Sequence, residues 1–190
     1  MNKFQCLVLS ATALSLPLLA LATDQAATDQ AQRSAWSKRG SSPLVDKVRQ
    51  ATAHFRDINV ATSEGWVPAT PCVSGPNSGA MGVHFILPAR VGDGAVKGDE
   101  PEALIYEPLS SGAMRLVGVE FIVIAADWAT NNPDGGAPSV DGHLMNYVSA
   151  PNRYGLPAFY ELHVWAWERN PEGNFADWNT QVTCNKQAAS

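Results

Sequence analysis

The apolar residues that follow position 43 recur at intervals of three and four, as they do on one face of an amphipathic helix. The stripe consists of Leu44, Val48, Ala51, Phe55 and Ile58. Ser42 and Pro43 supply a helix start, because serine caps a first turn and proline fits its first position. Gly65 supplies a helix end. The pattern therefore predicts one packed N-terminal amphipathic helix over about 43–63.

After this helix, short apolar and β-branched runs alternate with turns rich in Gly and Pro. Runs of this kind are typical of strands that follow one another in an antiparallel sheet. They cover about 66–70, 80–87, 103–108, 115–125 and 158–168. Two longer polar segments, 88–101 and 127–143, are predicted as functional or mobile loops. The expected fold class is α+β, mainly an antiparallel β-sheet or small barrel with one helix packed across it.

The beginning of the chain has the pattern of a secretory signal peptide over residues 1–22. One basic residue, Lys3, precedes an apolar stretch that ends in Ala20-Leu21-Ala22, a small-x-small cleavage site. Residues 23–40 have almost nothing apolar to bury and are predicted to be a disordered linker. Residues 41–190 are expected to form a single globular β-rich domain. We therefore expect a periplasmic or secreted protein without a membrane span.

Removal of the signal peptide changes both the charge and the number of cysteines. The whole chain has 13 basic and 18 acidic side chains, and loss of Lys3 leaves 12 basic ones and a net charge of −6. An acidic surface repels polyanions, so nucleic acid is not an expected partner. Cys6 is also lost, and Cys72 and Cys184 remain. In an oxidising compartment these two cysteines are predicted to form a disulfide bond.

Three ionisable residues lie inside the apolar runs predicted as strands: His84, Glu120 and His163. Burying such a group without a partner costs roughly 2–7 kcal/mol, so each needs one. Two imidazoles and a carboxylate form a ligand set for a transition metal ion such as copper, zinc, iron or manganese, and they leave coordination positions open. If the three strands are neighbours, these side chains meet within the sheet, with His143 as a fourth ligand. The prediction is a small metal-binding protein that binds or carries the ion or uses it in catalysis.

Side chains alternate between the two faces of a strand, which predicts the surroundings of His163. This histidine is expected to share a face with Glu161, Trp165 and Trp167. Glu161 would then be a second carboxylate at the site. Glycine stands two positions before both of the other ionisable residues, and it is expected to leave room there for an ion, a water molecule or a ligand.

Three other interpretations stay open at this point. In the first, the histidines are hydrogen-bonded core residues and Glu120 pairs with Arg115 or Arg153. In the second, a metal-free secreted module binds a small apolar or sugar ligand in a Trp-rich cleft. That cleft would be lined by Trp165, Trp167 and Glu161. In the third, the chain is an extracellular protein-interaction domain. A serine hydrolase or a nucleotide-dependent enzyme is not expected, because the chain lacks a Gly-x-Ser-x-Gly elbow and a phosphate-binding glycine loop.

Five sequence blocks follow one another along the globular part of the chain. They are Met81–Phe85, Pro101–Glu107, Leu116–Phe121, Leu162–Trp167 and Asn170–Phe175. In this order they resemble an uncharacterised family of small exported bacterial proteins, over roughly residues 45–184. The resemblance implies that the three ionisable residues and the two cysteines stand at the family's recurrent positions, and it implies no activity. The chain departs from the family at Asn179-Thr180, where the family tends to have Asn-Pro, a difference that affects a turn.

Overall fold

The computed structural model describes residues 42–185. The signal peptide predicted for residues 1–22 and the linker predicted for residues 23–40 lie outside the described residues. None of the helices in the described range has the length and apolar character that crossing a membrane requires.

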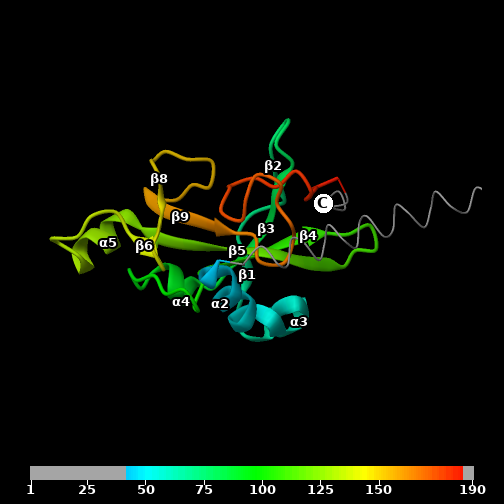
Figure 1. Cartoon of the computed structure of the whole chain (residues 1–190), viewed down its shortest axis with the longest axis horizontal. Helices are drawn as coiled ribbons and strands as arrows, with labels where there is room; N and C mark the ends of the chain where they lie inside the picture. Colours follow the sequence, from blue (N-terminus) through cyan, green and yellow to red (C-terminus); the bar gives the residue numbers. More distant parts are fainter. Residues whose placement is uncertain (1–41, 186–190) are drawn as a thin grey trace, which may run out of the picture. The chain divides into compact units, whose positions relative to one another are not determined.

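An antiparallel sheet forms the centre of the described domain (Figure 1). Its strands are β1 (Val67–Pro68), β2 (Val73–Ser74), β3 (Ala80–Ile86), β4 (Ala103–Pro108), β5 (Met114–Ile124), β8 (Asn146–Val148) and β9 (Phe159–Val164). The order along the sheet is β1-β3-β4-β5-β9-β8, and β2 also pairs with β3. The predicted α+β class is confirmed, but the sheet is open and does not close into a barrel. Its outer strands have only two or three residues, too few to pair with each other across a closed barrel.

The predicted N-terminal helix is present but is divided into three pieces. These are α2 (Pro43–Thr52), the 3₁₀ turn η1 (Ala53–Arg56) and α3 (Ile58–Ser63). The break comes at Asp57, whose backbone is extended and whose side chain accepts a hydrogen bond of 2.9 Å from the Asn59 N–H. Asp57 therefore caps a new helix, and it interrupts a helix whose apolar stripe continues without a gap. The pieces lie together on one side of the long strand β5 (Figure 1).

The two faces of the sheet have different surroundings. The face toward the helices is an apolar core, in which Val83, Phe85, Leu104, Tyr106, Val119, Phe121, Leu162 and Val164 pack with the apolar stripe of the helices. The opposite face carries two smaller apolar clusters. One contains Ala80, Ile105, Val117 and Trp165, and the other contains Ala103, Ile122 and Phe159. His84, Glu120 and His163 lie on this second face, between residues of the two clusters.

Gly82 and Gly118, which precede His84 and Glu120, let neighbouring strands approach closely and do not make room for a ligand. A Cβ atom on Gly82 would lie 2.7 Å from the Tyr106 carbonyl oxygen, and its φ of +114° favours glycine. A Cβ atom on Gly118 would lie 2.8 Å from the Val164 carbonyl oxygen. Both positions thus permit a close approach of neighbouring strands, and the expectation that they leave room for an ion or ligand is wrong.

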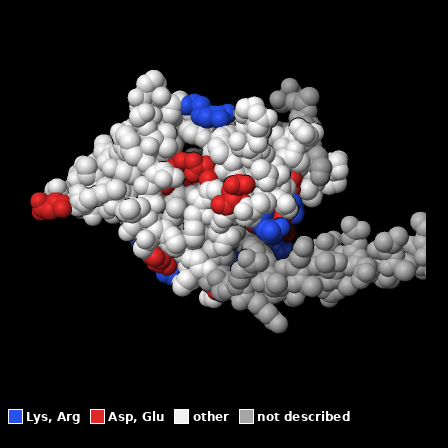
Figure 2. All heavy atoms as spheres, turned by 45° about the horizontal axis from the view of Figure 1, so that its top comes forward, with Lys and Arg blue, Asp and Glu red and all other residues white. Residues whose placement is uncertain are grey.

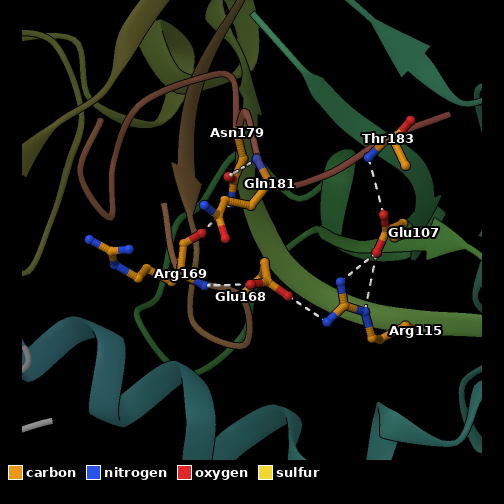
Figure 3. A network of polar contacts seen from close by, with 7 residues as sticks. All are labelled: Glu107, Arg115, Glu168, Arg169, Asn179, Gln181 and Thr183. Carbon is orange, nitrogen blue, oxygen red and sulfur yellow. Dashed lines mark hydrogen bonds and ion pairs between the residues drawn. The ribbon is translucent and has the colours of Figure 1, made fainter. Parts of the chain in front are cut away.

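The chain that follows β9 folds back across the sheet and is anchored at its end. The predicted disulfide joins Cys72 to Cys184, across a sequence separation of 112 residues. A polar network fixes the same segment (Figure 3). The buried Glu107 accepts a hydrogen bond of 3.1 Å from the Thr183 N–H, and Arg115 bridges Glu107 to Glu168 with N–O distances of 2.5 Å each.

The two segments predicted as loops contain short elements of their own. The first contains α4 (Pro88–Val91). The second contains part of α5 (Ala125–Asn131) and a separate two-stranded sheet of β6 (Ser139–Val140) and β7 (His143–Leu144). Elements this short have too little apolar periodicity to be recognised in the sequence.

The buried Glu102 gives the domain a pH-dependent stability. Its Oε2 accepts a hydrogen bond of 2.8 Å from the Ile122 N–H, and burial raises its pKa from 4.5 to about 8. Between these pH values the folded state binds more protons than the unfolded state. The free energy of unfolding therefore falls as the pH rises through this window.

We predict that Glu102→Gln, which keeps an acceptor for Ile122, gains stability relative to the wild type as the pH rises. The expected gain between about pH 5 and about pH 8 is on the order of 3 kcal/mol. Urea unfolding at the two pH values measures it, with exposed Glu172→Gln as the control. An equal difference between Glu102→Gln and wild type at both pH values would contradict the prediction.

Candidate metal centre

Three strands bring the predicted ionisable residues together. Glu120 on β5 stands directly opposite His163 on β9. His84 comes from β3, which is separated from β5 by β4, so the three strands are not all neighbours. On β4, Ala103 stands opposite Glu120 and Ile105 stands opposite His84, so the two ionisable side chains approach each other diagonally across β4. The His84 Nε2 atom lies 3.3 Å from Glu120 Oε2.

The ligand atoms of these residues are close enough to share one ion. One atom from each of His84, Glu120 and His163 lies within 4.8 Å of the others. Ligands about 2.0–2.2 Å from a tetrahedral metal ion are themselves separated by about 3.4 Å. The 3.3 Å between His84 and Glu120 matches this separation. The two imidazole rings meet edge to face, with their centroids 5.9 Å apart.

His163 is buried without a hydrogen-bond partner. Its side chain is 1% exposed, and neither Nδ1 nor Nε2 has a partner within the described part of the chain. Buried polar atoms in folded proteins are nearly always paired, so two unpaired nitrogens on one ring are exceptional. Glu161 Oε2 is also unpaired, and it lies 4.0 Å from His163 Nδ1.

His84 is held on one side by a hydroxyl group. Its Nδ1 lies 3.2 Å from Thr70 Oγ1, and its backbone N–H donates to the same oxygen over 3.3 Å. This contact leaves Nε2 directed at Glu120. With its proton on Nδ1, His84 presents the lone pair of Nε2 to the centre of the site.

Burial sets the protonation of the whole site. It lowers the pKa of His84 from 6.5 to about 4, and burial together with His84 lowers the pKa of His163 to about 3. Both rings are therefore neutral at pH 7, which is the form that binds metals. Burial raises the pKa of Glu120, and the neighbouring Glu161 raises it further. Burial also raises the pKa of Glu161. Without a cation these carboxyl groups thus favour their protonated forms.

A further carboxylate approaches from the segment that follows β9. One atom from each of Glu161, His163 and Asp177 also lies within 4.8 Å of the others. Asp177 is partly buried, and it accepts a hydrogen bond of 3.4 Å from Asn146 Nδ2. Asp177 was not predicted as a site residue, because it lies outside any periodic segment of the sequence. Thr70 was missed although it ends the run predicted as a strand over 66–70, because a hydroxyl group at a strand end is common and gives no signal of a site.

The structure places His143 away from these residues. His143 lies on β7, its Nε2 is 3.3 Å from Ser42 Oγ, and its ring packs on Phe175 with centroids 4.0 Å apart. It is not part of either group of neighbouring ligand atoms in the described chain. The prediction of His143 as a fourth ligand is therefore not supported, since the long segment before it forms a separate small sheet.

The predicted Trp-rich cleft does not form. Trp165 is fully buried, with its indole N–H donating to the Ala176 carbonyl oxygen over 2.6 Å. β9 ends at Val164, so the strand alternation does not extend to Trp167. The Trp167 side chain instead donates to Thr52 Oγ1 in the helical layer, over 3.0 Å. Of the three residues proposed for this cleft, Glu161 and Trp165 lie beside His163, and the Trp165 ring stacks on the imidazole with centroids 6.3 Å apart.

The arginine partners considered for Glu120 are also engaged elsewhere. Arg115 forms ion pairs with Glu107 and Glu168. Arg153 lies over the Trp178 ring, 6.0 Å from its centroid. The interpretation of Glu120 as one half of a structural ion pair with arginine is therefore not supported.

A pocket of about 90 Å³ opens onto the cluster. His84 and Glu120 form its polar part, and Thr70 and Tyr154 add hydroxyl groups. The rest of the lining is apolar and consists of Ala69, Ile86, Val91, Ile122, Leu156 and Phe159. Two ligand atoms of the candidate metal centre thus face a space that admits a small molecule.

Comparison of the chain with protein families, with curated proteins and with solved structures gives no significant match. The assignment of a function therefore depends on the geometry and chemistry of the site.

Proposed function

We propose that this chain is an exported metal-binding protein, in which His84, Glu120 and His163 hold one divalent transition metal ion. The observation that carries the proposal is the buried His163, whose two ring nitrogens have no partner and whose ligand atom lies within 4.8 Å of those of His84 and Glu120. A purely structural cluster would leave these nitrogens unpaired at a cost of about 1–3 kcal/mol each. A bound ion removes that cost for at least one of them.

The donor set limits the kind of ion. Two imidazoles and one carboxylate suit zinc, copper, iron or manganese. The disulfide bond supports the exported location, because disulfides persist in oxidising compartments. Three protein ligands also leave a coordination position open, on the side where the pocket meets His84 and Glu120.

We further propose that the chain belongs to the family of small exported bacterial proteins that its five sequence blocks resemble. Four of these blocks supply residues of β3, β4, β5 and β9, the strands that position the site. A shared site would explain why sequence similarity concentrates in these strands.

Metal content tests the proposed function directly. Untagged full-length protein, loaded with zinc and dialysed, is expected to retain one equivalent by elemental mass spectrometry. Retention of no metal would contradict the proposal. Retention of two equivalents would indicate that the group of Glu161, His163 and Asp177 forms a second site.

If the site holds one ion, Glu161 is an outer partner: it does not bind the ion but accepts a hydrogen bond from His163, which does. A histidine that binds a metal through one nitrogen donates its other N–H, commonly to a carboxylate. The 4.0 Å between His163 Nδ1 and Glu161 Oε2 places that acceptor beside the ring, and a small movement closes the hydrogen bond. His163 Nδ1 and Glu161 Oε2, which both lack hydrogen-bond partners, would then be paired with each other.

We predict that Glu161→Leu lowers zinc affinity about 10- to 100-fold, because it removes the acceptor that orients His163. Glu161→Gln keeps an acceptor and is expected to lie between Glu161→Leu and the wild type. Competition with a zinc-binding dye measures the affinities. The exposed Glu172→Leu is the matched control and should bind as the wild type does. Wild-type affinity in Glu161→Leu would rule out this role.

A further inference from the structure

We infer that the pocket beside the metal centre binds a small neutral molecule, which has an oxygen atom that coordinates the metal and a short aliphatic chain. This inference rests on the proposed metal site. It adds the chemical class of the ligand that fills the open coordination position.

The pocket lies where a molecule bound in it can also coordinate the metal. The pocket is lined by His84 and Glu120, and the ligand atoms of these two residues are 3.3 Å apart. An ion held between them therefore lies at the polar part of the pocket. A molecule that enters the pocket meets the coordination position that the three protein ligands leave open.

The walls of the pocket define the body of the ligand. Apart from the four residues with polar side chains, every lining residue is aliphatic or phenylalanine. Side chains from β3, α4, β5 and the loop before β9 contribute, among them Ile86, Val91, Ile122 and Leu156. The volume of about 90 Å³ admits several non-hydrogen atoms, and with its apolar walls it suits a short aliphatic chain.

Charge defines the head group of the ligand. No lysine or arginine lines the pocket. The acidic residues at the site are Glu120, Glu161 and Asp177, which together balance or exceed the charge of one divalent ion. Acidic side chains also reach the surface near the middle of the view in Figure 2. An anionic head would add uncompensated negative charge to a buried site, so a neutral oxygen donor is favoured.

Two hydroxyl groups complete the polar end of the pocket. The Tyr154 hydroxyl makes a 3.5 Å contact with Met81 Sδ, a weak acceptor. It is therefore available to donate to an oxygen atom bound at the metal. The Thr70 hydroxyl contacts His84 Nδ1 and thereby orients the His84 ring toward the metal. The arrangement suits an alcohol or carbonyl oxygen, which accepts one hydrogen bond while it coordinates the ion.

The test uses full-length protein loaded with cobalt, whose visible absorption changes when a ligand joins the ion. We expect 1-butanol to bind about 50-fold more tightly than methanol, because the pocket buries three further methylene groups. Butyrate, which has a chain of the same length and an anionic head, is expected to bind more weakly than 1-butanol. Metal-free protein, titrated by calorimetry, should bind 1-butanol more weakly than the cobalt form does.

Two variants fill the pocket from different elements. Val91→Phe on α4 and Leu156→Phe in the loop before β9 are expected to keep one equivalent of cobalt and to lose the advantage of 1-butanol over methanol. Retention of cobalt shows that a variant folds. Two variants are used so that the test still stands if one of them does not fold.

The outcomes separate the two proposals. Failure of the wild type to take up cobalt or zinc would overturn the metal site and, with it, this inference. Uptake of metal with equal affinity for methanol and 1-butanol would overturn the inference alone. Tighter binding of butyrate than of 1-butanol, or equal binding of 1-butanol with and without metal, would also overturn it.

Discussion

His163→Ala and His84→Ala are each expected to abolish stable metal binding, with a loss of affinity greater than the roughly 10- to 100-fold caused by removal of an outer partner. Each substitution removes one of three ligands from a site that has no third histidine nearby in the described chain. The two remaining ligands hold an ion too weakly to survive dialysis. Elemental analysis of the purified variants measures the result.

The chain supplies its own matched controls for this experiment. His54→Ala and His143→Ala remove histidines that lie outside both groups of ligand atoms. They are expected to keep the full metal content. Loss of metal in either control, or retention of one equivalent in His163→Ala, would show that the ion is bound elsewhere.

A second substitution at the same position separates a functional role from a structural one. In His163→Phe, an apolar ring of similar size replaces a ring with two unpaired buried nitrogens. The metal-free variant is expected to be more stable than the metal-free wild type by about 2–6 kcal/mol, because two unpaired polar atoms are gone, each at a cost of about 1–3 kcal/mol. The variant should also bind no metal. If His163 had a structural role instead, the same substitution would lower the free energy of unfolding.

Reduction of the Cys72–Cys184 disulfide is expected to lower the free energy of unfolding by about 4–5 kcal/mol. The two cysteines are separated by 112 residues, and the loop they close includes every strand that carries a site residue. Cross-linking so long a loop removes much of the entropy of the unfolded chain. A domain of this size has a total stability of about 5–15 kcal/mol, so the loss is a large share of it.

Urea unfolding with and without a reducing agent measures this effect. The variant with both Cys72→Ser and Cys184→Ser should match the reduced wild type and should not respond to the reducing agent. A difference below about 1 kcal/mol between the oxidised and reduced forms would contradict the prediction. Because the bond also anchors the segment that carries Asp177, metal affinity in the reduced protein is a useful second measurement.

The three residues of the candidate metal centre were predicted from their local sequence because a charged or polar group within an apolar strand is unusual. His84, Glu120 and His163 each interrupt an apolar run, and burial in a strand demands a partner for such a group. The geometry that joins them was not predictable. His84 reaches Glu120 diagonally across the intervening strand β4, a contact that depends on the strand order and the register.

The errors in the prediction arose where local pattern and tertiary packing disagree. Strand alternation placed Trp167 beside His163, but β9 ends at Val164 and the indole packs in the helical layer. The helical stripe predicted one continuous helix, but the Asp57 cap divides it. His143 was assigned to the site because it is a metal-binding residue type, whereas its position depends on a small sheet with no signal in the sequence.

The amino-acid sequence by itself determined the α+β class, the main strands, the pairing of the two cysteines in the described chain and the identity of three buried ionisable residues. These features follow from periodicity and from the cost of burying polar groups, which act over a few neighbouring residues. Only the tertiary structure decided the strand order, the approach of Glu161 and Asp177 to His163, and the pocket beside His84. Those features depend on contacts between segments far apart in the chain, and no local pattern of residues encodes which distant strand lies alongside another.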